Sequence, residues 1–490
     1  MRPEPAILAI DLGTSEAKGG LVTLDGVIHR LARARYSIDV DTHTGHAEQD
    51  VASWWAATVE VVRTLRRASP DTRIVAIVMD GHGPTTAAVD REGNPTRRAI
   101  TWLDTRAATE QADLERASGL RGWVLGVTPA ALWIERHEPA VAERTQWYLN
   151  TWEWLALRLS GRAATSLMPE QMLPSDRVLA ATGLPPERIA PSVRTGSVLG
   201  GLVDDAAAEL GIPAGTPVVS GHVDAFVTFL GAGLRGPGDA MDAGGTAGGF
   251  GVYADRELVI PGTYSSPAPI AGLHILGGAF AATGKALDWY RDSVVGAGAT
   301  TESLIAEAAA TPPGADGLVF LPYLAGERSP IYDPDARGMF AGLSLAHERG
   351  HLARAILEAA AFAIRHVAEP ILAAGVPVRA MRVCGGPARS AVWNQIKADV
   401  TGFPVEVPSV AETAVIGSAI LGAVGIGAHP DLRTAIGEMS RIERTIEPRP
   451  AFQATYDRTF EAYRSLHGAT ADILRPLVAP GAVALTATPT

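Results

Sequence analysis

Two segments of the chain end an apolar run with an acidic residue, glycine and threonine. The first, AILAIDLGT, contains Asp11, Gly13 and Thr14, and the second, GDAMDAGGT, contains Gly245 and Thr246 about 230 residues later. A phosphate group binds where it can approach backbone N–H groups closely, and glycine beside threonine allows this at a tight turn. Each segment alone also fits an ordinary β-turn. The repetition favours phosphate binding, with two turns that hold a triphosphate from both sides.

Asp11 lies at the end of the first apolar run, where a carboxylate is costly to bury without a cation or hydrogen-bond donors. A magnesium ion, bound directly or through water, would satisfy this carboxylate. The alternative is an Asx-turn within a hairpin. We interpret Asp11 as the candidate metal ligand.

The elements that must position these turns follow an α/β pattern. The run that ends at Asp11 predicts a strand, a tight hairpin and a second strand, and residues 51–67 predict a helix. A buried strand is predicted at 73–81. Around residue 239 the pattern of strand, Gly-Thr hairpin and strand restarts, and a helix is predicted over 351–369. The alternation and the repeated hairpin predict a duplicated α/β protein.

Two standard nucleotide motifs are not met. GGAFAATGKA is the nearest match to a P-loop, but its spacing is wrong by one residue and Ala286 replaces the magnesium-binding hydroxyl. GAGLRG at 231–236 matches G-x-G-x-x-G, but it follows an apolar helical run and not a strand. A dehydrogenase is therefore not favoured.

The composition is that of a large globular protein of low charge. Its 490 residues, 47% hydrophobic and 19% charged, predict two to three domains. A net charge of -11 argues against a nucleic-acid partner. Residues 258–284 lack charge, but their prolines would leave backbone groups unpaired in lipid, so we expect no membrane partner. A single cysteine, Cys384, and the lack of a visible targeting segment favour a cytoplasmic protein.

The chain resembles the FGGY family of carbohydrate kinases nearly from end to end. AIDLGTSEAK resembles the family's first phosphate motif, and residues 338–358 fit its second signature at every position compared. A single short motif would be weak evidence, whereas an ordered set of long ones is specific. The other similar segments, of which the first is xylulokinase-like, are GHAEQDVASWW, AITWLDTRA, FLPYLAGERSPIYDPDARGMFAGL, VCGGPARSAVWNQIKADVTGFPV and GSAILGA.

The resemblance implies a duplicated actin-like (ribonuclease H-like) ATPase fold with ATP and sugar in a central cleft between two domains. We place the domains at 1–238 and 239–475, followed by a loose tail at 476–490. The resemblance also implies an aspartate near the end of the first domain as catalytic base, and Asp224 in SGHVDAFVTFLG takes that position. From the residues alone, Asp224 also fits a helix N-cap, and the two roles are compatible.

ATP and Mg²⁺ are the cofactors that the resemblance implies. Phosphoryl transfer needs a positioned hydroxyl and neutralised charge, so Asp224 would accept the proton of the sugar hydroxyl and Asp11 would help to hold Mg²⁺. Lys18 and Lys397 are two of only three lysines, and we expect Lys18 in the site and Lys397 on a solvated helix face. The residues expected around the nucleotide are Gly13, Thr14, Lys18, Gly245, Thr246, Gly284, Asp288, Gly385, Gly386 and Ser390.

The expected sugar positions depart from the family pattern. Pro84 stands where xylulokinases have histidine, Ala225 follows the catalytic position where an amide is common, and an expected aspartate is missing from TSLMPEQML. Lost hydrogen-bond partners weaken pairing with a pentulose, so we expect D-xylulose to be a poor substrate beside another ketose, polyol or sugar acid. The candidate sugar contacts are His82, Trp102 and Asp104, with core burial as the alternative for the first two.

Two functions compete on this evidence. One is ATP-dependent phosphorylation of a small carbohydrate hydroxyl, and the other is a non-catalytic actin-like ATP-binding regulatory protein. Asp224 and the signature at 338–358 favour the kinase, because chaperone-type relatives have neither. A homodimer is a further expectation from the resemblance.

Overall fold

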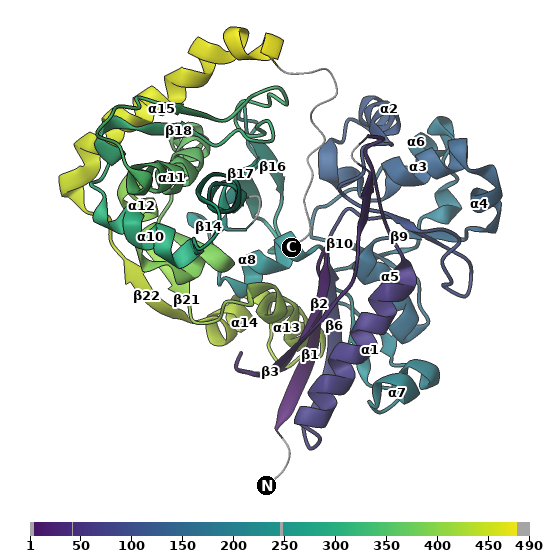
Figure 1. The fold of residues 1–490 in the computed structure, drawn as a ribbon. Helices are drawn as coiled ribbons and strands as arrows, with labels where there is room; N and C mark the ends of the chain where they lie inside the picture. The colour runs from purple at the N-terminus through teal and green to yellow at the C-terminus, as the bar shows by residue number, and fades with distance from the viewer. Residues whose placement is uncertain (1–3, 42, 246–247, 478–490) are drawn as a thin grey trace.

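The computed structural model describes residues 4–41, 43–245 and 248–477, in which two sheets lie side by side (Figure 1). The first sheet has the strand order β12-β13-β6-β1-β2-β3. All of β1 but its first residue is buried, as is the second half of β6, which explains their apolar runs. Its strands are β1 (Pro5–Leu12), β2 (Glu16–Thr23), β3 (Ile28–Arg35), β6 (Arg73–Gly81), β12 (Val198–Gly201) and β13 (Pro217–Val219).

The second sheet repeats this topology in the order β16-β17-β15-β14-β20-β21-β22. In the first sheet β1 is antiparallel to β2 and parallel to β6, and in the second β14 is antiparallel to β15 and parallel to β20. The predicted duplication is therefore confirmed. The strands are β14 (Asp239–Ala243), β15 (Gly248–Ala254), β16 (Tyr264–Pro267), β17 (His274–Phe280), β20 (Ala380–Cys384), β21 (Val405–Pro408) and β22 (Ile442–Ile446).

A long helix precedes the parallel central strand in each half. α1 (Val51–Ala68) begins after Asp50, whose side chain accepts a hydrogen bond from the second N–H of the helix. α11 (Arg349–Ala373) runs through Pro370, because its buried apolar face continues past the proline. Both predicted helices are confirmed, and both are longer than expected.

Two helices, α8 (Asp224–Gly231) and α13 (Thr413–Gly425), cross between the halves (Figure 1). A Cβ on Gly231 would lie 1.8 Å from a backbone oxygen of α13, and one on Gly417 would lie 1.9 Å from a backbone oxygen of α8. The helices can approach this closely only because both positions are glycine. α13 packs on β1 and β6, while Phe229 of α8 stacks on a tyrosine ring of β15. Each helix therefore packs on the sheet of the other half.

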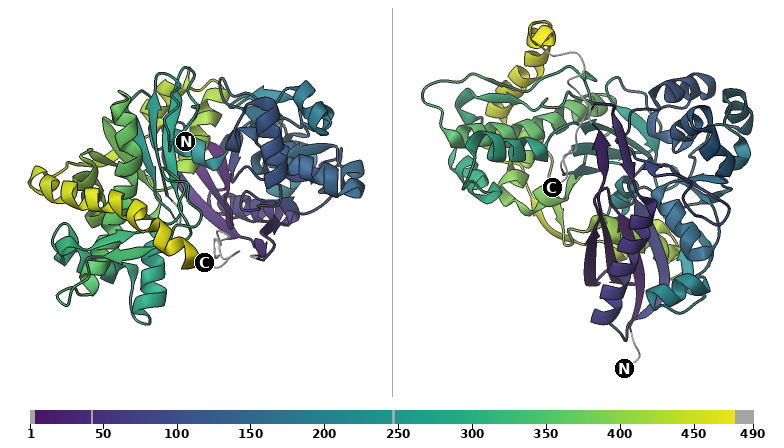
Figure 2. Two further views of the ribbon diagram at one scale, coloured as in Figure 1. Left: turned by 90° about the horizontal axis from the view of Figure 1, so that it is seen from above. Right: turned by 45° about the vertical axis from the view of Figure 1, so that its right-hand side comes forward.

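Between β6 and β12 the chain adds a region of short elements beside the first sheet (Figure 2). This region supplies most of the cavity described below. Its elements are β7 (Ala87–Val89), β8 (Ala99–Ile100), α2 (Ala108–Ser118), α3 (Thr128–His137), α4 (Pro139–Arg144), β9 (Trp147–Leu149), α5 (Thr151–Ser160), β10 (Thr165–Leu167), α6 (Asp176–Thr182) and β11 (Ser192–Arg194).

In the described part of the chain, no helix is long and apolar enough to cross a membrane. The uncharged segment 258–284 forms β16, β17 and the loops around them, as expected. The expected tail at 476–490 lies outside the described residues from 478 onward. Further helices are α7 (Asp204–Leu210), α9 (Gly284–Trp289), α10 (Thr301–Ala310), α12 (Ala391–Thr401), α14 (Leu432–Met439) and α15 (Gln453–Leu474).

Candidate active site

The first predicted phosphate turn lies beside two buried aspartates. In the register of the sheet, Asp11 of β1 is paired with Lys18 of β2 on one side and with Asp80 of β6 on the other. Lys18 Nζ lies 3.4 Å from Asp11 Oδ2, and Ser418 of α13 donates a hydrogen bond of 2.5 Å to Asp80 Oδ2. Oδ1 of each aspartate is buried without a partner. Oδ1 of Asp11 is thus available to a ligand as an acceptor, whereas Asp80 more readily keeps its proton.

Burial shapes the charges of this cluster. It raises the pKa of Asp11, with Lys18 opposing, and it raises the pKa of Asp80 well above its ordinary value, with a further increase from the charge of Asp11. Burial also disfavours the charge of Lys18, but Asp11 and Glu412 outweigh it and raise the pKa of Lys18. Asp80 is therefore the carboxyl that keeps its proton most readily. Our sequence analysis missed Asp80, although it ends an apolar strand just as Asp11 does.

Asp224 is the first residue of α8 and lies near the same cluster. Its Oδ1 accepts a hydrogen bond of 2.6 Å from the N–H of Ala225. The N-cap position belongs to Val223, so the expected N-cap role is wrong, because Asp224 is already part of the helix. Burial raises the pKa of Asp224 to about 7, Asp11 adds to the increase, and the Ala225 N–H and Lys18 oppose it. Such a carboxyl can accept and release a proton at neutral pH, as a general base requires.

Aromatic side chains surround the first turn. The Tyr36 hydroxyl donates to the carbonyl oxygen of Gly13, and Trp102 Nε1 donates to Thr14 Oγ1 at 3.1 Å. Burial and the nearby carboxylates raise the pKa of Tyr36 well above its ordinary value, so its hydroxyl stays protonated. Trp102 is 38% exposed. The core alternative for Trp102 is therefore wrong, because its indole reaches the turn and not the interior.

The second predicted turn meets the loop that follows β20. A Cβ on Gly385 would lie 2.0 Å from the backbone oxygen of Gly244, and Gly385 has a φ of 72°, so glycine is required there. The N–H of Gly284 donates to the backbone oxygen of Gly245 at 3.2 Å. The structure thus brings Gly245, Gly284 and Gly385 into one glycine cluster that exposes backbone instead of side chains.

The other residues predicted at the nucleotide differ in their surroundings. Gly386 directly follows the cluster, and Ser390 Oγ accepts a hydrogen bond of 3.1 Å from a backbone N–H of α12 as the N-cap of that helix. Asp288 lies on α9 and forms an exposed ion pair of 2.9 Å with Arg291. Thr246 lies outside the described residues.

Lys397 is buried, contrary to the prediction of a solvated helix face. Its ammonium lies 2.5 Å from Asp242 Oδ2 and 5.2 Å from the centre of the Trp393 ring, and the residue is 2% exposed. The buried carboxylate of β14 needs a cation, and α12 supplies it. The pair repeats in the second half the contact between Asp11 and Lys18 in the first.

Two of the predicted sugar contacts already have other partners. His82 is buried, with Nδ1 3.0 Å from Thr85 Oγ1 and its ring edge-on to Trp54, and burial lowers its pKa to about 3. These contacts favour the core alternative for His82. Asp104 accepts 2.8 Å and 2.7 Å hydrogen bonds from the Arg106 guanidinium and another of 2.6 Å from a backbone N–H. Its carboxylate therefore has little capacity left for a sugar.

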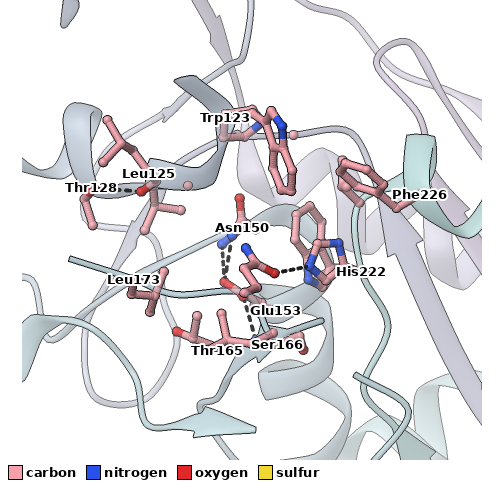
Figure 3. A pocket seen from close by; sticks show the side chains of 18 of the residues that line it. Trp123, Leu125, Thr128, Asn150, Glu153, Thr165, Ser166, Leu173, His222 and Phe226 are labelled. Atoms are coloured by element: carbon pink, nitrogen blue, oxygen red, sulfur yellow. Dashed lines mark hydrogen bonds between the residues drawn. The ribbon is translucent and has the colours of Figure 1, made fainter. Parts of the chain in front are cut away.

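A cavity of about 240 Å³ opens beside the catalytic candidate (Figure 3). Val223 and Ala225, which flank Asp224 in the chain, are part of its lining. So are several residues of the stretch 165–173, where the sequence departs from the family pattern. Its apolar residues come from distant parts of the chain, which is why the sequence analysis did not find them. This apolar wall consists of Pro84, Trp123, Leu125, Leu173 and Phe226.

Buried polar side chains form another part of the lining (Figure 3). Asn150 donates to Glu153 Oε2 at 3.0 Å, and Glu153 Oε1 accepts a backbone N–H of Ser166 at 2.9 Å. His222 Nε2 lies 3.2 Å from Gln171 Oε1. Burial raises the pKa of Glu153 to about 7 and lowers that of His222 to about 3, so the imidazole is neutral. Because Nε2 donates to Gln171, Nδ1 of His222 is an acceptor.

The donor set at the first turn fits a magnesium ion that binds together with a nucleotide. Within the described residues, no group of three or more His, Cys, Asp or Glu side chains could hold a metal ion. Magnesium is usually bound through one or two carboxylates, with waters and substrate phosphates completing its coordination. The unpaired, buried Oδ1 of Asp11 suits that arrangement, and the unpaired Oδ1 of Asp80 lies on the neighbouring strand.

The repeated sheets, each with a hairpin beside its central strands, define a duplicated actin-like ATPase fold. Residues 6–231 match the N-terminal domain model of the FGGY family of carbohydrate kinases, and residues 242–426 match its C-terminal domain model. The chain belongs to the FGGY family of carbohydrate kinases. The predicted family, fold and enzyme class are thus confirmed, and ATP is the phosphoryl donor of this family.

Individual relatives agree with this assignment. A xylulose kinase of Bacillus subtilis (strain 168) is 27% identical over 95% of this chain and 97% of its own length. A gluconokinase of the same organism is 27% identical over 86% of this chain and 88% of its own. Among solved structures, a xylulose kinase from Rhodospirillum rubrum is 31% identical, with a TM-score of 0.84 over 96% of this chain and 99% of that one.

Proposed function

We propose that this carbohydrate kinase transfers the γ-phosphoryl group of ATP to a hydroxyl of a small carbohydrate held in the cavity beside Asp224. The observation that carries the proposal is this carboxyl, whose chain neighbours Val223 and Ala225 line the cavity and whose pKa is raised to about 7 by burial and by Asp11. Asp224 accepts the hydroxyl proton as the oxygen bonds to the γ-phosphorus. The bond from that phosphorus to the β–γ bridging oxygen breaks, and ADP leaves.

The two turns are proposed to bind the phosphates. Gly13 and Thr14 with Lys18 hold them from the first half, and Gly245 and Thr246 hold them from the second. Support comes from the charge of Lys18, which neighbouring carboxylates maintain, and from the backbone left open at the glycine cluster. Gly385, Gly386 and Ser390 receive the nucleoside end, together with Gly284 and Asp288.

Asp11 is proposed to hold Mg²⁺, with Asp80 as its neighbour. The support is the buried Oδ1 of each carboxyl, which has no partner. When bound, the ion neutralises charge on the phosphates. Lys18 lies 3.4 Å from Asp11 and opposes the rise in the Asp11 pKa that burial causes, which favours the ionised carboxylate.

Several broader expectations stay part of the proposal. A division into domains at 1–238 and 239–475 is supported by the two sheets. All strands of the first sheet lie before residue 239, and all strands of the second begin at or after it. A cytoplasmic location is supported by the use of ATP as phosphoryl donor in this family, because ATP is available in the cytoplasm. The homodimer is a prediction that analytical ultracentrifugation can test.

Replacing Asp224 tests the proposed base directly. Asp224→Ala should lower kcat by roughly 10²–10⁴, the usual contribution of a general base, and should leave ATP affinity intact because the residue does not touch the proposed phosphate turns. Asp255→Ala, an exposed surface change in the second half, is the matched control and should not alter kcat. Near wild-type turnover by Asp224→Ala would remove this residue from the reaction.

A further inference from the structure

The cavity beside Asp224 has no side chain that could neutralise an acidic substrate. None of the described residues that line it is lysine or arginine, and its His222 is neutral. Its one acidic side chain is that of Glu153. A carboxylate buried here would lack a cation and would lie in the same cavity as another carboxyl group, which is strongly unfavourable. The lining therefore selects against sugar acids.

The polar side chains of the lining are those of Thr128, Asn150, Glu153, Thr165, Ser166, Gln171, His222 and Tyr264. Asn150 Oδ1, Trp152 Nε1, Thr165 Oγ1 and His222 Nδ1 belong to lining residues and have no partner. Two of these atoms are acceptors, one is a donor, and the threonine hydroxyl is both. Among the polar lining residues, Asn150, Glu153, Thr165, Ser166 and His222 lie together, where their side chains can pair with hydroxyl groups of a ligand (Figure 3).

A second part of the lining is formed by large apolar side chains, whose carbon atoms give a bound hydroxyl no hydrogen bond. The rings of Trp123 and Phe226 lie with their centroids 4.5 Å apart, and Leu125 and Leu173 are further apolar side chains of the lining (Figure 3). A hydroxyl placed against Phe226, Leu125 or Leu173 would lose its hydrogen bonds to water without replacement. A methyl or alkyl group placed there would gain from burial.

We infer that the acceptor is a neutral polyol or sugar with an apolar end, such as a deoxy or alkyl-substituted carbohydrate. Its hydroxyls face Asn150, Thr165 and His222, and its apolar end lies against Trp123 and Phe226. This inference rests on the proposed function, because it assigns the substrate class of the same site. It also gives the physical reason why D-xylulose, which carries oxygen on every carbon, should be a poor substrate.

Matched acceptors that differ only at one end test the inference. The sugar set is D-xylulose with its 1-deoxy and 5-deoxy forms, one of which keeps the reacting hydroxyl, and the polyol pair is glycerol with 3-butoxypropane-1,2-diol. D-gluconate represents the acids. Dissociation constants come from calorimetry on Asp224→Asn enzyme, and kcat/KM comes from wild-type enzyme. We expect the butoxy diol, and at least one deoxy sugar, to bind at least about tenfold more tightly than its hydroxylated counterpart.

A substitution in the apolar wall tests whether this wall causes the preference for acceptors with an apolar end. Leu173→Gln should reduce the tenfold preference to near equality, because it places a hydrogen-bonding group in that wall. Met172→Gln is the matched control, since Met172 is adjacent in the chain, 68% exposed and absent from the lining, and it should leave the preference unchanged.

The outcomes separate this inference from the proposed function. Equal or tighter binding of D-xylulose, glycerol or D-gluconate overturns the inference, and so does a preference that Leu173→Gln does not alter. If the binding preference holds but wild-type enzyme releases no ADP with any acceptor, the proposed function fails while the assignment of the cavity stands.

Discussion

The pKa of Asp224 is set by its surroundings, because the pKa of an aspartate in water lies far below neutral pH. Burial and the charge of Asp11 raise its pKa to about 7. A general base works only in its ionised form, so its protonation at lower pH removes activity. If Asp224 is the base, as proposed, a pKa near 7 predicts a reaction rate that depends on pH within the physiological range.

We expect kcat/KM for the acceptor, at saturating ATP, to rise about tenfold per pH unit below pH 7 and to level off above it. The measurement is a set of initial rates from about pH 5.5 to 9, after confirming that the protein stays folded at each value. A profile that is flat between about pH 5.5 and 7 would contradict the base assignment.

Residue types alone located the first turn correctly but assigned some side chains wrongly. The hairpin that carries Asp11 and Lys18 could be predicted from its apolar run and Gly-Thr pair, but the contact between the two side chains was not predicted. The roles of His82 and Lys397 could not be predicted, because they depend on which face of an element meets the core. Trp102 was predicted to contact the sugar, with core burial as the alternative, and the structure instead shows it donating to Thr14 at the edge of the site.

At the scale of elements, the helix crossing and the buried ion pair hold the two turns in place. Lys397 of α12 reaches Asp242 at the end of β14, close to the second turn. Removing one partner of a buried pair leaves an uncompensated charge, whereas removing both leaves none.

Lys397→Met should lower the free energy of unfolding by about 3–5 kcal/mol, because it leaves the buried Asp242 carboxylate without a cation. The double variant Asp242→Leu/Lys397→Met should recover most of that loss. Urea unfolding of the wild type and of the two variants measures both. Equal stability of the single variant and the wild type would show that the pair contributes nothing.

Gly417→Ala should destabilise the protein by about 1–3 kcal/mol and reduce kcat, because its Cβ would meet the backbone of α8 at 1.9 Å and push the helix that carries Asp224. Gly468→Ala is the control. It lies inside α15 with no atom within 4 Å of its Cβ, so it should stabilise the helix by up to about 1 kcal/mol and leave kcat unchanged. Unfolding curves and kcat are measured for both variants. If Gly417→Ala and Gly468→Ala have the same stability and the same kcat, the contact between α8 and α13 does not position Asp224.

At the scale of the whole molecule, the repeated hairpin was enough to predict the duplication. The strand directions of the two sheets match from the hairpins through β6 and β20 to β13 and β21. The cavity could not be predicted, because Trp123, Asn150 and His222 come from separate segments with no local motif. The crossing of α8 and α13 was also missed, since small residues in a helix predict close packing without naming the partner.

We propose that this chain phosphorylates a neutral carbohydrate with ATP through Asp224. The most direct measurement follows ADP release and the mass of the acceptor together, with wild-type and Asp224→Ala enzyme, over a panel of ketoses, polyols, deoxy sugars and sugar acids. We predict acceptor-dependent ADP release by the wild type, an acceptor heavier by one phosphoryl group, and a loss of both by roughly 10²–10⁴ in the variant. ADP release that is independent of every acceptor, or an equal rate in the variant, would contradict the account.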